Sequence, residues 1–230
     1  MSPGPAAPTL ADAAAVADLA TYLGRARRAD PDGAARMVAH GQVLAVYVSP
    51  VHGGGGPTVL GLRTLPLAGQ AGSSGRPDLD VTVPLGALLD RCARIAAEPS
   101  PGGGPVELPI PPNPSAGEAW AGMAPPRTGW ETVGLLEPDV LRSVARSGIE
   151  EIAVGVPTAA GGHAVGRLRA LVWGRPLSPD LDGVPAGVAF AAQALGFVPD
   201  GEPAALYRCG AWIRVTTGRG HVLARPPALL

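Results

Sequence analysis

Glycine and proline gather in a few stretches of this chain, and the longest stretch separates two parts that can fold. The 230 residues include 33 glycines and 27 prolines. Residues 98–130 are rich in Pro, Gly and Ser, with breakers at 101–105 and 109–114. Proline has no backbone N–H to donate, so this segment is expected to be a linker or surface strap without regular structure. Trp120 and Trp130 predict that its second half packs down, because each can bury a large apolar area.

The part before the strap, residues 1–97, reads as a helix, four strands and a second helix. Thr9 with Asp12 forms an approximate capping box, and apolar residues then recur at helical spacing to about Arg28. Four segments rich in Val, Leu, Tyr or Thr follow, at residues 35–39, 43–51, 58–67 and 79–83. Their short connections favour an antiparallel β-meander, and a helix that begins at Pro84 is expected to cover one face of it.

The part after the strap, residues 131–230, begins helical and ends in strands. Pro138 starts one helix, and Ser147 with Glu150 forms a fresh capping box, which predicts a helix, a sharp turn at Ser147–Gly148 and a second helix. Further helices are expected at 164–173 and 185–197, the latter buried, and then three short strands at 205–208, 211–216 and 221–225. The predicted fold class is α+β, and whether the two parts form one domain stays open.

The chain contains no lysine, since all eighteen basic side chains are arginine. This absence excludes a Schiff base, a pyridoxal phosphate anchor, a P-loop lysine and a kinase-type phosphate clamp. No G-x-G-x-x-G occurs, and the four histidines have no second His or Cys at ligand spacing. Asp30–Gly33 and Asp180–Gly183 carry only part of a calcium loop and read as turns. We therefore expect no cofactor and no metal.

The run His52–Gly56 resembles the HGGG oxyanion motif of lipases and esterases. That mechanism also needs a nucleophile elbow, and none of the nine serines lies in a G-x-S-x-G frame. The run is therefore interpreted as a long glycine-rich hairpin turn. The pair Glu150 and Glu151 falls in a predicted first helical turn, where the helix dipole favours negative charge whatever the function.

The two cysteines, Cys92 and Cys209, lie in different halves without a C-x-x-C, which fits buried thiols in a reducing compartment. The first nine residues lack a basic region and a continuous apolar run, so no signal peptide is visible. The longest uncharged run, residues 183–198, is too short to span a bilayer. We expect a cytoplasmic protein with no membrane partner.

The C-terminal strands carry a local positive charge on a chain whose formal net charge is −1. No acidic residue follows Glu202, and period-two alternation places Trp212, Arg214 and Thr216 on one strand face. If that face is open to solvent, it offers guanidinium groups beside an aromatic plane. The predicted binding residues are Arg208, Trp212, Arg214, Arg219, His221 and Arg225.

Three functions remain open. The favoured one is a non-catalytic protein-interaction module, with a protein partner or self-association, because the catalytic patterns fail on frame or spacing. The second is a nucleic-acid binder resembling a winged helix, with a recognition helix starting near Ser147 or Ala164 and a wing tip at 217–220. The third is a small-molecule enzyme of unrecognised type, which needs a pocket holding a histidine beside a carboxylate, the candidates being His52, His163 and His221.

Two short runs carry a family resemblance. Residues 173–177 (WGRPL) and 212–225 (WIRVTTGRGHVLAR), on a lysine-free background rich in Ala and Arg, are similar to uncharacterised proteins of GC-rich actinobacteria. This resemblance implies no activity.

Overall fold

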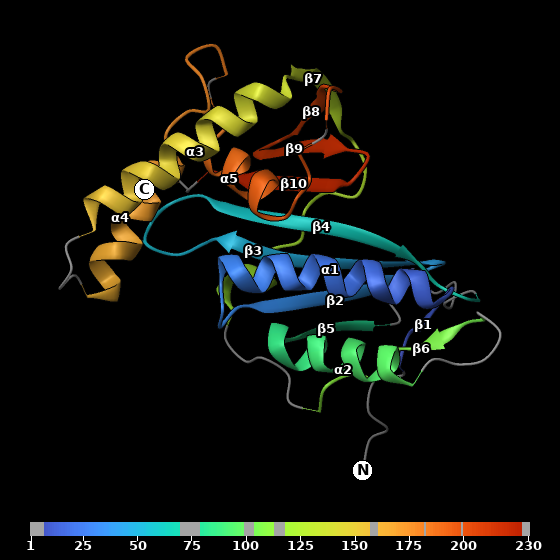
Figure 1. The fold of residues 1–230 in the computed structure, drawn as a ribbon. Coiled ribbons are helices and arrows are strands. Elements are labelled where there is room, and N and C mark those ends of the chain that lie inside the picture. The colour runs from blue at the N-terminus through green and yellow to red at the C-terminus, as the bar shows by residue number, and fades with distance from the viewer. Residues whose placement is uncertain are drawn as a thin grey trace. The chain divides into compact units, whose positions relative to one another are not determined.

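The computed structural model describes residues 7–69, 79–98, 104–112, 118–156, 161–181, 183–198 and 200–226 (Figure 1). Its contacts divide the chain into two compact units, unit 1 with Met1–Val48 and Leu62–Ala121, and unit 2 with Ser49–Gly61 and Gly122–Leu230. The predicted α+β class with antiparallel strands is confirmed. Across the described ranges, none of the helices has the length and apolar character that crossing a bilayer requires.

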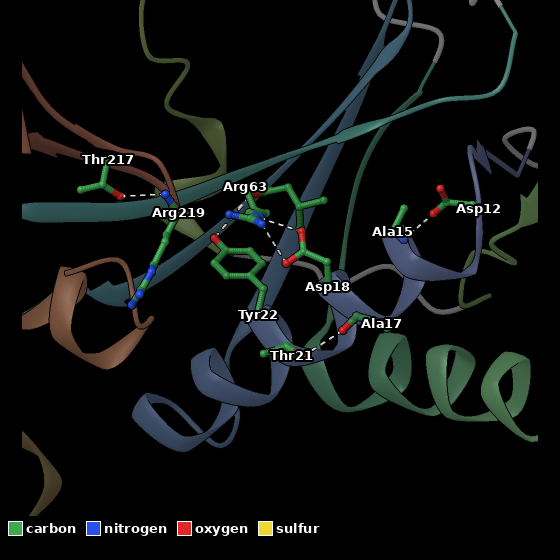
Figure 2. A network of polar contacts seen from close by, with 10 residues as sticks. Asp12, Ala15, Ala17, Asp18, Thr21, Tyr22, Arg63, Thr217 and Arg219 are labelled. Carbon is green, nitrogen blue, oxygen red and sulfur yellow. Dashed lines mark hydrogen bonds and ion pairs between the residues drawn. The ribbon is translucent and has the colours of Figure 1, made fainter. Parts of the chain in front are cut away.

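Unit 1 begins with a short strand and a capped helix. β1 (Thr9–Leu10) pairs antiparallel with β6 (Val106–Glu107). Helix α1 (Ala13–Ala29) starts at Asp12, whose side chain accepts a hydrogen bond from the Ala15 backbone N–H at 2.8 Å (Figure 2). Asp12 alone is therefore the N-cap. The predicted capping role of Thr9 is wrong, because Thr9 already pairs in β1.

The sheet of unit 1 differs from a meander in the place of its last strand. Its order is β5 (Leu79–Pro84), β2 (Ala34–His40), β3 (Val43–Val51) and β4 (Thr58–Pro66). The predicted meander is thus wrong for β5, which pairs with β2 and not with β4. This pairing aligns the buried alternate residues of β5 and β2 on one face, so their apolar side chains share one core.

Two helices cover that face of the unit 1 sheet. α2 (Leu85–Ala97) contacts α1, β2 and β5, and its predicted apolar stripe is buried through Leu85, Leu88 and Cys92. From α1, Tyr22 is fully enclosed and its hydroxyl donates to the Val46 carbonyl at 3.3 Å. Desolvation therefore raises the pKa of the Tyr22 phenol well above its ordinary value. Asp18 of α1 also accepts two hydrogen bonds from Arg63 of β4, at 2.7 and 2.9 Å (Figure 2).

The strap contains two short ordered elements besides its irregular parts. One is β6, and the other is the 3-10 turn η1 (Ala119–Gly122). Trp120 is buried, and its indole N–H donates to Glu118 Oε2 at 3.0 Å. The expected packing of the tryptophans is therefore seen for Trp120. Residues 99–103 and 113–117, which include several of the predicted breakers, lie outside the described residues.

The sheet of unit 2 includes the three predicted C-terminal strands and one that the sequence analysis missed. β8 (Ala204–Cys209), β9 (Trp212–Thr217) and β10 (Gly220–Arg225) form an antiparallel series, as expected. The missed strand, β7 (Glu131–Leu136), pairs with β8 and ends the strand order, so it is an edge strand. A register shift between Thr132 and Gly134 marks a bulge in it.

The described residues of unit 2 form three helices. α3 (Pro138–Gly155) runs without interruption, so the predicted turn at Ser147–Gly148 is wrong, and the helix-turn-helix expected for a winged helix is not formed there. α4 (Gly162–Gly174) and α5 (Gly187–Ala194) follow, and α3 contacts both (Figure 1). The expectation of a buried α5 is confirmed, because its first six residues are all buried.

Candidate functional site

The sheet of unit 2 has two chemically different faces. On one face Leu206, Ile213, Val215, Val222 and Ala224 are buried and form the core with the helices. Strand register places the alternate residues on the opposite face, which we call the outer face. It consists of Thr132, Leu135, Ala205, Tyr207, Cys209, Trp212, Arg214, Thr216, His221, Leu223 and Arg225.

Arg214 lies near the middle of the outer face between two aromatic rings. Its Cζ atom is 4.5 Å from the centroid of the Trp130 ring and 4.5 Å from that of the Tyr207 ring. Tyr207 is its cross-strand partner in β8, and Trp130 comes from the end of the strap, just before β7. Each cation–π contact contributes on the order of 0.5–2 kcal/mol, depending on how far the cation is desolvated. The guanidinium group is thus in cation–π contact with two aromatic rings at once.

The hydrogen-bonding edge of Arg214 is, by contrast, unused. No hydrogen bond or ion pair of this side chain occurs within the described ranges, and its Nε is buried without a partner. Desolvation lowers the pKa of the Arg214 guanidinium, and the nearby Tyr207 phenol partly offsets this. Other arginines contrast with it, since bidentate carboxylate bonds serve Arg36 through Asp80 and Arg175 through Glu151.

The expectation that Trp212 faces water is wrong. Its exposed fraction is 7 %, whereas Arg214 is half-buried. Trp212 pairs with Cys209, and Cys209 lies under the end of the strap, since its Sγ donates to the Thr128 carbonyl at 3.7 Å. Trp130 is held in turn by a hydrogen bond from its indole N–H to the Pro126 carbonyl. The strap therefore lies at this end of the outer face, where the sequence analysis expected open solvent.

Of the other predicted binding residues, two share the outer face. His221 Nδ1 is 3.0 Å from the Thr216 hydroxyl, and Arg225 is exposed at the end of β10. Arg208 points to the other side of the sheet, because it pairs with the core residue Ile213. Arg219 lies in the β9–β10 turn, where it donates to Asp200 Oδ2 at 3.0 Å. The six predicted residues therefore do not form one surface.

Two residues of the site were not predicted. Tyr207 was placed in a strand but not considered for binding, and Trp130 was assigned only to the strap. Period-two alternation and the antiparallel turn at Cys209–Gly210 could have identified Tyr207 as the neighbour of Arg214. Nothing in the local sequence indicates that Trp130 folds over a strand more than seventy residues away.

The glycine run His52–Gly56 lies in the turn between β3 and β4, as the hairpin interpretation predicts, and it also packs against α4, which was not predicted. A Cβ atom on Gly54 would lie 2.8 Å from the Gly166 carbonyl oxygen, and one on Gly56 would lie 2.8 Å from the Ala170 Cβ. Helix α4 therefore packs directly against the loop backbone. His52 Nδ1 donates to the Ser49 carbonyl at 3.0 Å, and Arg169 donates to the Pro50 carbonyl at 3.2 Å.

The remaining candidates from the sequence are His163, the Glu150 and Glu151 pair, and possible metal ligands. His163 is exposed in the first turn of α4, and Glu151 forms the ion pair with Arg175 described above. Within the ranges that the structure describes, no group of three or more His, Cys, Asp or Glu side chains is arranged to hold a metal ion.

The two cysteines differ in burial. Cys92 is buried as expected, and desolvation raises the pKa of its thiol to about 11. Cys209 is only half-buried, which corrects the expectation of a second buried thiol.

Comparison with curated proteins gives no match. Among solved structures, the chain is similar to a DNA polymerase sliding clamp from Pseudomonas aeruginosa, at 12 % identity and a TM-score of 0.46, over 96 % of this chain and 64 % of that chain. It is also similar to a DNA polymerase sliding clamp from Caulobacter crescentus, at 14 % identity and a TM-score of 0.47, over 97 % of this chain and 66 % of that chain. The chain thus spans just under two thirds of the length of these clamp chains, and a likeness this distant carries no functional argument.

Two family models match the sequence, one in each half. Residues 125–229 match "Domain of unknown function (DUF8185)", and residues 6–122 match "Domain of unknown function (DUF8010)". The DUF8185 match covers less than half of the chain. Because the DUF8010 match covers more than half of it, the protein belongs to the DUF8010 family.

Proposed function

We propose that this protein is a non-catalytic protein-interaction module and that the outer face of unit 2 is its docking surface. The occupant is a segment of a partner protein that places apolar side chains on the sheet near β7. The observation that carries the proposal is the combination, on one sheet face, of an exposed leucine with an aromatic–arginine stack.

Leu135 and Tyr207 supply the apolar part of this surface. Leu135 lies on the edge strand β7 with 63 % of its surface exposed, and its cross-strand partner Ala205 is half-buried. Tyr207 is also half-buried, two residues further along β8. Contiguous apolar patches with a polar rim are typical of docking surfaces, and hot-spot residues in known interfaces are enriched in Tyr, Trp and Arg.

Affinity purification tests the proposal when it is run with matched surface variants. The tagged full chain is recovered from the cells that express it, with and without nuclease, as wild type, Leu135→Asp and Val154→Asp. Val154 of α3 is the matched control, because it is an apolar residue of the same unit with 89 % exposure and it does not belong to the outer face. Proteins bound through the outer face are expected to be retained by Val154→Asp and lost with Leu135→Asp, in both nuclease arms.

Three outcomes would overturn the proposal. One is an identical set of proteins with Leu135→Asp, and another is loss of all partners on nuclease treatment, which would favour the nucleic-acid alternative. The third is a change of oligomeric state alone, measured by light scattering, since the outer face would then serve self-association and not a different partner.

A further inference from the structure

Resting on the proposed docking surface, we propose that Arg214 is a carboxylate-binding site that accepts one Asp or Glu side chain from the docked partner segment. The guanidinium group contacts two aromatic rings and has no hydrogen-bond partner within the described residues. The N–H groups at the tip of the side chain are the ones proposed to bind the carboxylate.

The two ring contacts limit how a ligand can reach Arg214. The centroids of the Trp130 and Tyr207 rings each lie 4.5 Å from Arg214 Cζ, so both rings occupy space next to the guanidinium group. Of the three guanidinium nitrogens, Nε is buried and lacks a partner. Because the residue as a whole is half-buried, we take Nη1 and Nη2 at the tip of the side chain as the groups that an incoming ligand would meet. These two nitrogens form the end-on fork that matches the two oxygens of a carboxylate.

The charges around Arg214 favour an acidic ligand. None of the eleven outer-face residues is Asp or Glu, whereas Arg214 and Arg225 are both cationic. Elsewhere in the described structure, Arg36, Arg63, Arg142, Arg175 and Arg219 each bond a carboxylate of this chain. Arg214 can bond a carboxylate in the same way as these arginines, but within the described structure it has no carboxylate partner. A carboxylate from outside would supply that partner in a desolvated environment, where a charge-assisted bond is strong.

The stack also preorganises the site. An arginine side chain ordinarily loses rotamer freedom when it binds a ligand, and this loss reduces affinity. Arg214 already contacts two rings in the free protein, and Trp130 is itself held by the hydrogen bond from its indole N–H to the Pro126 carbonyl. The Arg214 side chain therefore loses rotamer freedom when the protein folds, and less rotamer freedom is left to lose when a ligand binds.

Peptides of defined sequence test the inference. The first probe is an extended peptide with blocked ends and one Glu among Val and Thr residues, and the second carries Gln in place of that Glu. A third carries phosphoserine, and a fourth is the Gln peptide with a free C-terminal carboxylate. Each is titrated at millimolar concentrations into the ¹⁵N-labelled full chain, and the Trp130 indole N–H and Arg214 Nε–H resonances are followed.

We expect the Glu peptide to shift both resonances and to bind about tenfold or more tightly than the Gln peptide, because the charge-assisted pair is lost with Gln. Arg214→Lys keeps the charge and removes the planar fork, so it is expected to reduce the preference for Glu to about threefold or less. The matched control is Arg225→Gln, which removes an exposed cation of the same face and should change the affinity by less than about threefold.

Equal binding of the Glu and Gln peptides to the wild-type chain would overturn the carboxylate site, as would the absence of shifts with both. Tighter binding of the phosphoserine or free-carboxylate peptide would overturn the assignment to an acidic side chain. The proposed function fails separately. If Leu135→Asp loses its partners and Arg214→Lys and Arg214→Gln keep them, the docking surface stands and the carboxylate site does not. Thermal unfolding of each variant establishes that it is folded.

Discussion

Gly148 of α3 lies directly against the indole ring of Trp173 of α4. A Cβ atom at position 148 would lie 2.3 Å from Trp173 Cζ3 and 2.5 Å from Cη2. The Trp173 ring is itself stacked on Phe190 of α5, with the ring centroids 4.7 Å apart. Because the ring is also stacked on Phe190, any shift that made room for a methyl group at position 148 would disturb that stacking as well. The glycine is therefore what allows the three helices to approach so closely.

Gly148→Ala is expected to destabilise the protein. Overpacking typically costs about 1–3 kcal/mol, and the very short approach to the Trp173 ring places this position in the upper part of that range, above the roughly 1 kcal/mol that alanine gains over glycine in a helix. The measurement is the free energy of unfolding in urea. Gly166→Ala in α4 is the control, since its Cβ would meet nothing within 4 Å, and it should be neutral or slightly stabilising. Equal effects of the two substitutions would contradict the assignment.

The same glycine shows where sequence reasoning fails. Ser147, Gly148 and Glu150 reproduce the local pattern of a helix end followed by a capping box, so local rules predict a turn. The structure instead continues α3 through this point, because packing against Trp173 needs a residue without a side chain. Local sequence does not distinguish a glycine that ends a helix from one that receives a distant ring.

The sequence predicted which segments form strands better than it predicted the order of those strands in the sheet. The alternation in β8, β9 and β10 placed Arg214 and Trp212 on one face correctly. Trp130 and Thr128 of the strap contact that face and reduce its exposure. The alternation of residues along a strand cannot predict a contact from a distant segment. The position of β5 beside β2 is likewise a long-range choice that the short connections did not reveal.

The glycine loop makes a prediction of its own. Gly54 and Gly55 both have positive φ, at 63° and 78°, so alanine at either position is strained by roughly 1–2 kcal/mol. Gly54 alone also faces the Gly166 carbonyl oxygen at 2.8 Å, whereas a Cβ on Gly55 meets nothing within 4 Å. Gly54→Ala should therefore lower the free energy of unfolding by at least about 1 kcal/mol more than Gly55→Ala. Equal losses in urea denaturation would show that α4 does not press on this loop.

The stack of Arg214 on Trp130 should be measurable as a coupling energy. A double-mutant cycle with Arg214→Met and Trp130→Leu keeps apolar bulk and removes the cation and the ring separately. We expect a coupling of about 0.5–2 kcal/mol in the free energy of unfolding, the range for a partly desolvated cation–π contact. The control cycle pairs Arg225→Met with Trp130→Leu and should give a coupling close to zero. A coupling near zero in the first cycle would remove the stack from the description of the site.

The two cysteines should differ in reactivity toward iodoacetamide. Cys92 is 1 % exposed and the pKa of its thiol is raised to about 11 by burial, so the reactive thiolate is scarce and inaccessible at pH 8. Cys209 is half-buried at the strap. Mass spectrometry of the native protein is expected to show labelling of Cys209 well before Cys92, and labelling of both in urea. Rapid native labelling of Cys92 would mean that α2 opens readily.

The ion pair between Glu151 of α3 and Arg175 beyond α4 should make stability depend on acid pH. Two hydrogen bonds from Arg175, at 2.6 and 2.7 Å, lower the pKa of the Glu151 carboxyl below its ordinary value. A carboxyl whose pKa is lower in the folded state stabilises that state above the unfolded pKa, about 4.3 for Glu, and this stabilisation is lost as the pH falls through the folded pKa. The wild type should therefore have a higher Tm than Glu151→Gln at pH 7. The difference in Tm should be small because both side chains are exposed, and it should shrink from about pH 4 downward. Arg175→Gln should lower the Tm by the same amount, and adding Glu151→Gln to that variant should cause no further decrease. A Tm difference that stays constant between pH 7 and about pH 3 would contradict the role of the pair.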